Sequence, residues 1–491
     1  MSIDLSLDRL QRLVQHLPPY TRPTFHIAGT NGKGSVSAIL TSILRNSSPP
    51  LSVGRYNSPH LVSIYDCIVI NGEPVDPDVY ATARTHIERV DAEHNTRLSN
   101  FELLTLTALS IFEQARVDFV VLEVGMGGRL DATNIIPDEA VLLSALTAVD
   151  LDHQMFLGNT VEDIAREKAA IARKGRPFVL GSQRHAAVAG VVREVLEQIG
   201  ADLVPSLQVV KRDWDDRIDG PPAPAFSLKS ASDFKEPPPQ AVKVHMPCFS
   251  RELHALLPLY GNHQLDNLGV ALTAISLLLT HPSCARHALQ DRMTPETVAR
   301  GIQAVRWPGR LSFHTIPASP ADRIPRPLVV LADGAHNPAS SGTLGAYITH
   351  LLSLINGQDT PRTLTLTYIL ALSHSPPKTP LQTLAPILPP TLPLGSKLKV
   401  KVNVACVTFT PPEGMPWVKC VPPAEVREVV SARVFDADVW VAEEGESEQL
   451  VKALEWAARR DGDGEVEGLV IVAGSLYLVA DLYRFLSRTR E

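Results

Sequence analysis

The chain has 491 residues, of which 44% are hydrophobic and 20% are charged, and its formal net charge is −7. This length is too great for one hydrophobic core, so we expect two or more domains of ordinary globular composition. Without a basic surplus, neither nucleic acid nor an anionic membrane is expected as the main partner, although a few local cations suffice to bind a nucleotide.

The cysteine pattern and the N-terminal segment bear on the compartment. Five scattered cysteines, none in C-x-x-C spacing, argue against a disulfide framework and a cysteine zinc site, which favours a reducing compartment. The segment MSIDLSLDRLQRLVQHL has the pattern of an amphipathic helix and not of a signal peptide. No uninterrupted apolar run approaches the roughly 18 residues that span a bilayer. We therefore expect a cytoplasmic protein, with a mitochondrial pool as an alternative.

The stretch 25–35, FHIAGTNGKGS, is predicted to form a buried strand, a glycine-rich turn and the start of a helix. Such a turn suits the phosphates of a nucleotide, Lys33 adds a positive charge, and the Ser35 hydroxyl could reach Mg²⁺. The strict G-x-x-x-x-G-K-[ST] pattern is not met, because Ile27 replaces the first glycine and Gly34 separates Lys33 from Ser35. The alternative is a turn without a ligand. The predicted phosphate loop consists of Gly29, Thr30, Asn31, Gly32, Lys33, Gly34 and Ser35.

Helix and strand patterns alternate after this loop, which predicts a mostly parallel, doubly wound α/β sheet. The expected helices are 76–95, 101–117 and 160–175, and the expected strands are 118–125, 139–153 and 176–182. Residues 205–246 interrupt the pattern with proline-rich, polar sequence, which predicts a loop or a weak β-insertion. Order resumes at 253–279, expected to be a loop that leads into a nearly all-apolar helix.

The second half of the chain again alternates strands and helices, from PLVVLADGAHN to the closing GLVIVAGSLYLVADLYRFL. The stretch RWPGRLSFHT before it has the character of a hinge. The predicted organisation is an N-terminal phosphate-binding domain at 1–306, which contains the insertion at about 205–246, a hinge at 307–312, and a smaller α/β domain at 313–491.

Polar side chains follow two of the predicted strands. Glu123 precedes GMGGRLDATN at the carboxyl end of a strand, where doubly wound sheets place ligands, and its carboxylate could hold Mg²⁺. The alternative is a solvated acid. Asp150, Asp152 and His153 end the next predicted strand. Since Mg²⁺ prefers oxygen, the chemistry alone favours a hydrogen-bonding role for His153.

Four further residues have an ordinary and a functional explanation. Lys168 lies in a predicted helix, where a surface i→i+4 ion pair is the usual role. Arg310 could pair with phosphate oxygens, and Asp333 could accept hydrogen bonds from a ribose. With His336, they fall at the hinge and at a strand end of the second domain, and a cleft between domains is a common ligand site. Loop structure alone explains these three equally well.

Nine motifs occur in the order of one known family: GTNGKGS, NSPHL, NFELLT, EVGMGGRLDATN, DHQMFLGNTVEDIAREKAAI, GNHQLDN, WPGRL, DGAHN and AGSLYLVADL. Together they resemble the folylpolyglutamate synthase and dihydrofolate synthase family, a branch of the Mur ligase superfamily. The resemblance runs from about residue 5 to the C-terminus, outside the proline-rich insertions. It implies a P-loop ATPase domain followed by a smaller Rossmann-like α/β domain.

The resemblance also implies a reaction and its residues. ATP would phosphorylate a pterin-linked carboxylate, and L-glutamate would attack the acyl phosphate. The implied catalytic residues are Lys33, Lys168 and His153, and the implied Mg²⁺ ligands are Ser58, Glu123 and His153. Lys168 matches a lysine that becomes carbamylated and ligates a second Mg²⁺, and K⁺ is a further expected ion. The implied nucleotide contacts are Asn267, Arg310, Asp333 and His336.

The family contains two activities. Asn31 and the Phe101–Glu102 pair look more like dihydrofolate synthases and bacterial bifunctional enzymes. The proline-rich insertions predict a eukaryotic source, with a fungus as the narrower expectation. We therefore expect glutamate to be joined to 7,8-dihydropteroate, with folylpolyglutamate synthase or a bifunctional enzyme as the alternative. The expected partners are dihydropteroate or folate, L-glutamate and ATP, and a monomer is expected. SHSPPKTP departs from the acidic-and-basic loop of bacterial members, which leaves the glutamate site open, and Ala170 replaces a usual glycine.

Two other protein classes agree less well with the sequence. A P-loop kinase or GTPase would carry a guanine-reading N-K-x-D stretch or lack the second α/β domain, and no such stretch is present. A nucleotide-binding regulatory module that has lost catalysis would lack Lys33, Glu123 or Lys168, and all three are present.

Overall fold

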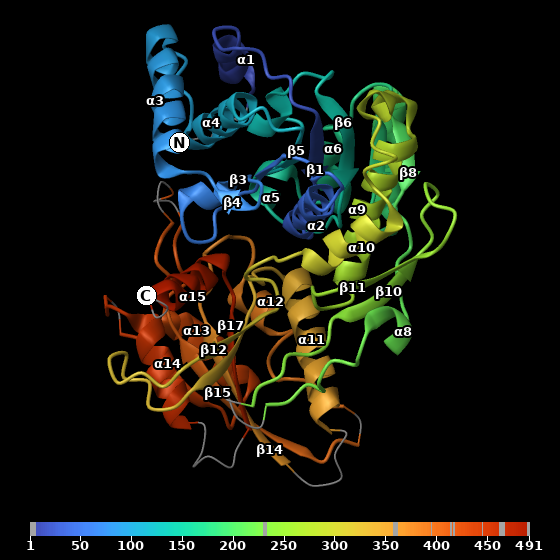
Figure 1. Ribbon diagram of the computed structural model, residues 1–491. Coiled ribbons are helices and arrows are strands. Elements are labelled where there is room, and N and C mark those ends of the chain that lie inside the picture. Colours follow the sequence, from blue (N-terminus) through green and yellow to red (C-terminus); the bar gives the residue numbers. More distant parts are fainter. Residues whose placement is uncertain are drawn as a thin grey trace. The chain divides into compact units, whose positions relative to one another are not determined.

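The computed structural model describes residues 6–228, 233–356, 362–393, 395–412, 415, 418–443, 445–460 and 467–488. The chain forms two compact units, whose elements are labelled in Figure 1. Unit 1 comprises Met1–Gly220, Gln240–Pro258 and Asn262–Arg306, and unit 2 comprises Pro221–Pro239, Leu259–Gly261 and Trp307–Glu491. Among the described residues, no helix is long and apolar enough to cross a membrane.

An eight-stranded sheet forms the centre of unit 1, with the order β4-β3-β2-β5-β1-β6-β7-β8. Its strands are β1 (Thr24–Ala28), β2 (Val53–Tyr56), β3 (Ile68–Ile70), β4 (Glu73–Pro74), β5 (Phe119–Glu123), β6 (Val141–Leu146), β7 (Pro177–Leu180) and β8 (Asp202–Pro205). The six strands from β2 to β8 in this order are parallel, and β3 and β4 pair antiparallel at one edge. The mostly parallel α/β sheet predicted from the sequence is therefore confirmed.

The helices of unit 1 begin at recognisable capping residues. The Ser99 hydroxyl and the Glu102 carboxylate form a capping box at α4, and the Thr160 hydroxyl accepts a hydrogen bond from the Asp163 N–H at α6. The helices are α1 (Asp8–Val14), α2 (Lys33–Arg45), α3 (Pro77–His94), α4 (Asn100–Gln114), α5 (Gln154–Leu157), α6 (Val161–Ala169), α7 (Ala186–Ile199), α8 (Asp216–Asp219), α9 (His263–Thr280) and α10 (Pro295–Ala304). Short 3₁₀ helices are η1 (Ile64–Cys67), η2 (Ala132–Ile135) and η3 (Pro282–His287).

Two expectations for unit 1 were wrong in detail. Residues 253–257 form strand β11 (Leu253–Leu257) and not a loop, because they pair antiparallel with β10 (Gln240–Val244), which in turn pairs with β9 (Val210–Lys211). The strand expected at 139–153 ends at Leu146, where its pairing with β1 and β7 ends, so the acidic residues and His153 lie in the loop beyond it.

Unit 2 contains a six-stranded sheet with the order β12-β13-β17-β14-β15-β16. Its strands are β12 (Ser312–Ile316), β13 (Leu328–Ala332), β14 (Arg362–Leu370), β15 (Leu398–Cys406), β16 (Asp438–Val441) and β17 (Glu467–Ala473). Only β12 among them is antiparallel to its neighbour. The helices are α11 (Pro338–Asn356), α12 (Pro380–Leu384), α13 (Pro423–Arg433), α14 (Gln449–Arg460) and α15 (Leu476–Arg488).

The proline-rich insertion is divided between the two units. Strands β9 and β10 lie in unit 1, whereas residues 221–239 lie in unit 2. There, Phe226 and Phe234 pack against Phe313, with ring centroids 6.1 and 5.5 Å away. Our sequence-based domain boundaries placed the whole insertion in the N-terminal domain, because aromatic packing against a distant strand has no local signature.

Candidate active site

The residues between β1 and α2 form a tight glycine turn at the carboxyl end of the central strand. Gly29 and Gly32 have φ angles of 151° and 99°, and a Cβ atom at these positions would lie 1.8 Å from Thr147 Oγ1 and 2.3 Å from Asn267 Oδ1. Both positions therefore require glycine. The N-terminal N–H groups of α2 begin at this turn, an arrangement that suits an anion such as phosphate.

Lys33 and Glu123 lie close together because their strands are neighbours. β1 and β5 are parallel, with Ile27 opposite Glu123, so their carboxyl ends meet at the same edge of the sheet. Lys33 Nζ donates hydrogen bonds to the carbonyls of Gly29 at 3.1 Å and Thr30 at 3.4 Å, and lies 3.8 Å from Glu123 Oε1. The buried Glu123 carboxylate also accepts a hydrogen bond of 2.6 Å from the Asn57 side-chain amide, which directly follows β2.

Lys168 is buried against the same turn. Its side chain is only 3% exposed, and its Nζ donates a 2.9 Å hydrogen bond to the Gly29 carbonyl. Burial, followed by repulsion from Lys33, lowers the pKa of Lys168 to about 7, although Asp152 and Asp131 oppose the shift. Near neutral pH a large share of this amine is therefore uncharged and nucleophilic. The surface ion pair considered from the residues alone is wrong, because the loop after β5 covers this side of α6.

The loop from Thr147 to His153 is attached to the phosphate loop. Thr30 Oγ1 donates to the Asp150 carbonyl and accepts from the Asp150 N–H, both at 3.1 Å. His153 follows with a left-handed φ of 51°, is exposed, and immediately precedes α5. Asp152 lies near enough to Lys168 to affect its pKa, which places this loop beside the buried lysine.

The glycine turn offers only a few protein side chains that could ligate a metal ion. Among the described residues, no group of three or more His, Cys, Asp or Glu side chains is arranged to hold a metal ion. Mg²⁺ in nucleotide sites commonly takes one or two carboxylates and completes its shell with phosphate oxygens and water. The buried Glu123 carboxylate at the glycine turn and the partly exposed Ser58 hydroxyl after β2 are donors of this kind.

Helix α9 contributes a buried amide pair to the phosphate loop. Asn267 Oδ1 is the atom that a side chain at Gly32 would meet. Asn267 Nδ2 donates to Gln264 Oε1 at 2.9 Å, and Gln264 Nε2 donates to Ser35 Oγ at 3.2 Å. Asn267 was a predicted site residue, whereas Gln264 was missed. Its position in GNHQLDN, three residues before Asn267 and thus on the same helix face, is the signal that could have found it.

A second group of predicted residues lies in unit 2, at the carboxyl end of β13. The Asp333 carboxylate accepts hydrogen bonds from the N–H groups of Leu311 and Ala335, both at 2.9 Å. Burial raises the pKa of Asp333, and the nearby Arg310 opposes this shift. His336 Nδ1 lies 2.9 Å from the Gly334 carbonyl. Arg310 precedes β12, whereas Asp333 and His336 follow β13, and the antiparallel pairing of the two strands brings these two loops of unit 2 together.

Lys378, in SHSPPKTP, was missed by the sequence reasoning. Its Nζ donates a 2.6 Å hydrogen bond to the His336 carbonyl. The loop that departs from the bacterial pattern therefore still places a cation beside the predicted nucleotide residues of unit 2. A lone lysine between prolines offered the only sequence signal for it.

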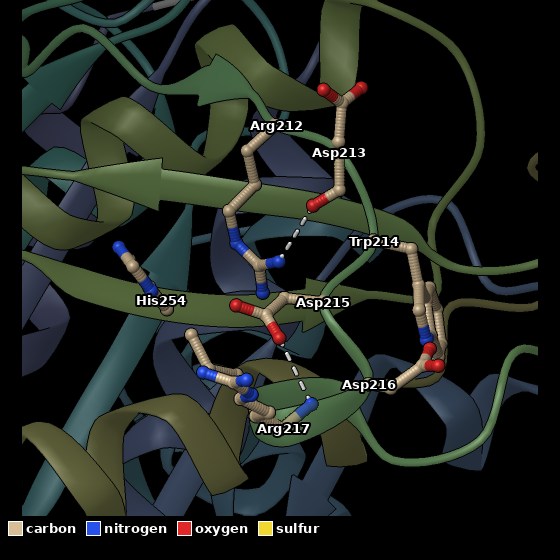
Figure 2. A pocket seen from close by; sticks show the side chains of 8 residues that line it. Arg212, Asp213, Trp214, Asp215, Asp216, Arg217 and His254 are labelled. Atoms are coloured by element: carbon tan, nitrogen blue, oxygen red, sulfur yellow. Dashed lines mark hydrogen bonds between the residues drawn. The ribbon is translucent and has the colours of Figure 1, made fainter.

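An open hollow of about 510 Å³ lies elsewhere in unit 1, beside α8. Figure 2 shows that its lining acids Asp213 and Asp216 point in different directions and do not converge on one point. Arg212 is engaged by Asp219 through hydrogen bonds of 2.6 and 2.5 Å. None of the predicted site residues lines this hollow.

Comparisons with known proteins agree with the motif order. The family model described as dihydrofolate synthetase, C-terminal domain, matches residues 321–485. The chain is 31% identical to the dihydrofolate synthetase of Saccharomyces cerevisiae over 99% of this chain and 98% of that protein. It is 30% identical to a probable dihydrofolate synthetase of Schizosaccharomyces pombe over 99% of each chain. The solved structure of E. coli FolC in complex with DHPP and ADP has a TM-score of 0.73 and 23% identity, covering 100% of this chain and 95% of that one, and therefore shares the fold.

Proposed function

The chain belongs to the folylpolyglutamate synthase and dihydrofolate synthase family, and on this premise we propose that it joins L-glutamate to 7,8-dihydropteroate at the expense of ATP. The product is dihydrofolate. The observation that carries the proposal is the similarity to two fungal dihydrofolate synthetases along almost the entire length of both chains. The partly exposed Lys33, the buried Lys168 and the Glu123 carboxylate around the glycine turn supply the chemistry that this reaction needs.

ATP is assigned to the glycine turn and the N-terminus of α2. Its phosphates would accept hydrogen bonds from backbone N–H groups of residues 29–35, and Lys33 would balance the negative charge that develops on the transferred phosphoryl group. Asn267 on α9 is assigned to the same nucleotide. The relative of known structure in E. coli was solved with ADP, which supports a nucleotide in this fold. Arg310, Asp333 and His336 are assigned to the nucleotide from unit 2.

A divalent cation is assigned to Ser58, Glu123 and His153. When bound, Mg²⁺ supplies charge neutralisation at the phosphates. Lys168 is assigned to a second Mg²⁺, because a large share of its amine is uncharged near neutral pH. The amine would form an N–C bond with carbon dioxide and release a proton, and the resulting carbamate oxygens would be ligands for a second Mg²⁺. K⁺ is proposed as a further ion.

The chain's residues then support two successive steps. In the first, the dihydropteroate carboxylate attacks the γ-phosphorus, the bond to ADP breaks, and an acyl phosphate forms. In the second, the uncharged amine of L-glutamate attacks the acyl carbon, the bond from this carbon to the phosphate oxygen breaks, and inorganic phosphate leaves as the nitrogen loses one proton to give the amide. Lys33, His153 and Lys168 are the proposed catalytic residues. In support, both lysines donate to the Gly29 carbonyl of the turn assigned to the phosphates, and the loop that leads to His153 is bonded to this turn through Thr30.

Three further properties belong to the proposal. We propose a monomer whose partners are small molecules. We propose the cytoplasm as its location, since the cysteines Cys67, Cys248, Cys284, Cys406 and Cys420 are all unpaired. The extension of folate glutamate tails is the alternative activity of the same site.

Purified protein with MgATP, dihydropteroate and radiolabelled L-glutamate tests the function directly. We expect label in dihydrofolate and one ADP per amide formed. Tetrahydrofolate monoglutamate, given in a parallel reaction, separates the two activities, and label entering only this substrate would replace dihydrofolate synthase with folylpolyglutamate synthase. No label in any pterin product would contradict the ligase proposal.

A further inference from the structure

His26 is a fully buried imidazole in the middle of β1, three residues before Gly29. Strand β1 pairs with β5 on one side and β6 on the other, so the ring projects from a central strand of the sheet that carries the phosphate loop. Its Nε2 lies 2.9 Å from Thr133 Oγ1. No hydrogen-bond partner for its Nδ1 is found among the described residues. Burial keeps the pKa of His26 well below its ordinary value, so the ring is neutral.

The contacts between Thr133 and Asp131 determine which group donates in the hydrogen bond between His26 and Thr133. Thr133 Oγ1 lies 2.5 Å from Asp131 Oδ1, and the Thr133 N–H donates to the same oxygen at 3.0 Å. The other carboxylate oxygen accepts the Met126 N–H at 2.8 Å. Burial raises the pKa of Asp131, and the hydrogen bonds from Met126 and Thr133 oppose this shift. Both carboxylate oxygens act as acceptors of these backbone N–H groups. The Thr133 hydroxyl therefore donates its one proton to Asp131, and its oxygen accepts the Nε2–H of His26.

Asp131 in turn holds the loop that follows Glu123. Its bond to Met126 closes residues 126–131 into a compact turn. This turn packs on the helix of Lys168: the Arg129 N–H donates to the Glu167 carbonyl at 2.9 Å, and a Cβ on Gly128 would lie 3.1 Å from Lys168 Cα. Lys168 reaches back to the Gly29 carbonyl. These contacts connect β1 to the phosphate loop through Thr133, Asp131, the turn at 126–131 and Lys168 on α6, and we refer to this series of contacts as the circuit.

We propose that His26 is a positioning residue of the ligase site, which acts through Thr133 and Asp131 to hold the Glu123 and Lys168 side chains at the phosphate loop. The inference rests on the proposed function for its metal and nucleotide ligands, but its hydrogen-bond circuit consists of this chain's own residues. Its last contact, from Lys168 to the Gly29 carbonyl, returns to the segment that follows His26 in the chain.

A buried histidine that only fills the core would behave differently. Its loss would lower the stability of the sheet, and ligand binding by the folded protein would stay the same. Loss of a group that orients ligating side chains typically reduces metal affinity or activity by about 10- to 100-fold. Metal affinity of the folded protein therefore separates the two roles.

The test measures Mn²⁺ binding by electron paramagnetic resonance, in the presence of a non-hydrolysable ATP analogue, for four variants. For His26→Leu and Thr133→Val we expect Mn²⁺ affinity about 10- to 100-fold below that of the wild type. The Mn²⁺ affinity of the double variant should be no lower than that of either single variant, because both substitutions interrupt the same series of contacts. His26→Gln should bind close to wild type, because its amide can place an N–H donor near the position of Nε2.

Thr107→Val is the matched control. Its hydroxyl is also fully buried and donates a 2.7 Å hydrogen bond, but to the Leu103 carbonyl of its own helix. This variant should lose thermal stability and keep wild-type Mn²⁺ affinity. If His26→Leu does not fold, the near-isosteric Thr133→Val carries the test.

Wild-type Mn²⁺ affinity in folded His26→Leu and Thr133→Val, or additive losses in the double variant, would overturn the proposal. The outcome is separable from the proposed function. Weakened metal binding in these variants with no amide formation by the wild type would leave the circuit standing and refute the ligase. Amide formation by the wild type with unchanged metal binding in the variants would support the ligase and refute the positioning role of His26.

Discussion

Two charged clusters of unit 1 differ in how completely their charges are matched. Arg212 and Asp219 form a short, two-point pair, and Asp219 also accepts the Asp215 N–H at 2.9 Å. At the glycine turn, Lys33 and Lys168 share one backbone carbonyl, and Glu123 is 3.8 Å from the nearer amine. The first cluster is complete by itself and holds a loop. The second brings two amines together, an arrangement that an anionic ligand would stabilise.

The open hollow is a weaker candidate for the active site than the glycine turn. The hollow of Figure 2 has acidic and basic side chains, but its arginine is already engaged within the loop. The ion pair at the glycine turn, Lys33 with Glu123, is longer at 3.8 Å, and burial and repulsion from Lys33 lower the pKa of Lys168. Two amines that donate to one backbone carbonyl, one of them buried with a lowered pKa, indicate a ligand more reliably than the size of a hollow.

Replacement of Lys168 by alanine should have the largest effect on function. We expect turnover to fall by about 10²- to 10³-fold, because a group that balances charge at the phosphates is lost. Nucleotide affinity should remain, since the turn and Lys33 are unchanged. Steady-state amide formation and calorimetric titration with ADP measure the two quantities, and wild-type turnover in this variant would remove Lys168 from the mechanism.

The lowered pKa of Lys168 should make the free energy of unfolding depend on pH. Because the folded pKa of Lys168 is lowered to about 7 from its ordinary value, the unfolded chain binds the additional proton above pH 7. The free energy of unfolding should therefore rise with pH from about 7 to about 10, by at most about 1.4 kcal/mol per pH unit. Below pH 7 this contribution is constant. Urea unfolding of wild type and Lys168→Met in carbonate-free buffer measures it, and equal slopes for both would contradict the account.

Replacement of Arg212 by alanine should affect stability alone. The buried Asp219 carboxylate loses its two-point partner, which should lower the free energy of unfolding by about 1–3 kcal/mol. Turnover at saturating substrate should stay at the wild-type level, since this pair is complete without a ligand. Chemical denaturation and the amide assay check both parts. A loss of turnover in the folded variant would show that the comparison between the clusters is mistaken.

Much of the fold followed from local sequence patterns. The parallel sheet, the turn after β1 and the position of Glu123 were predicted, because apolar periodicity and adjacent glycines determine them within a few residues. The burial of Lys168 was not evident from its helix, because the group it contacts, Gly29, is 139 residues away. The His26–Thr133–Asp131 contacts escaped for the same reason, since Thr133 lies 107 residues from His26.

Strand β11 and the divided insertion illustrate the same limit. The segment LHALL has no strict alternation and became a strand through pairing with β10. Residues 221–239 belong to unit 2, where Phe226 and Phe234 pack against Phe313, although in the sequence they lie between two strands of unit 1. Pairing and packing partners outside the local window decided both outcomes.

Transfer of an oxygen isotope tests the central claim most directly. Dihydropteroate labelled with ¹⁸O in its carboxylate is converted with ATP and L-glutamate, and the released phosphate is examined by mass spectrometry. An acyl phosphate requires one carboxylate oxygen to leave with the phosphate, so we predict one ¹⁸O atom per phosphate released. Amide formation that releases phosphate without ¹⁸O would contradict the proposed mechanism.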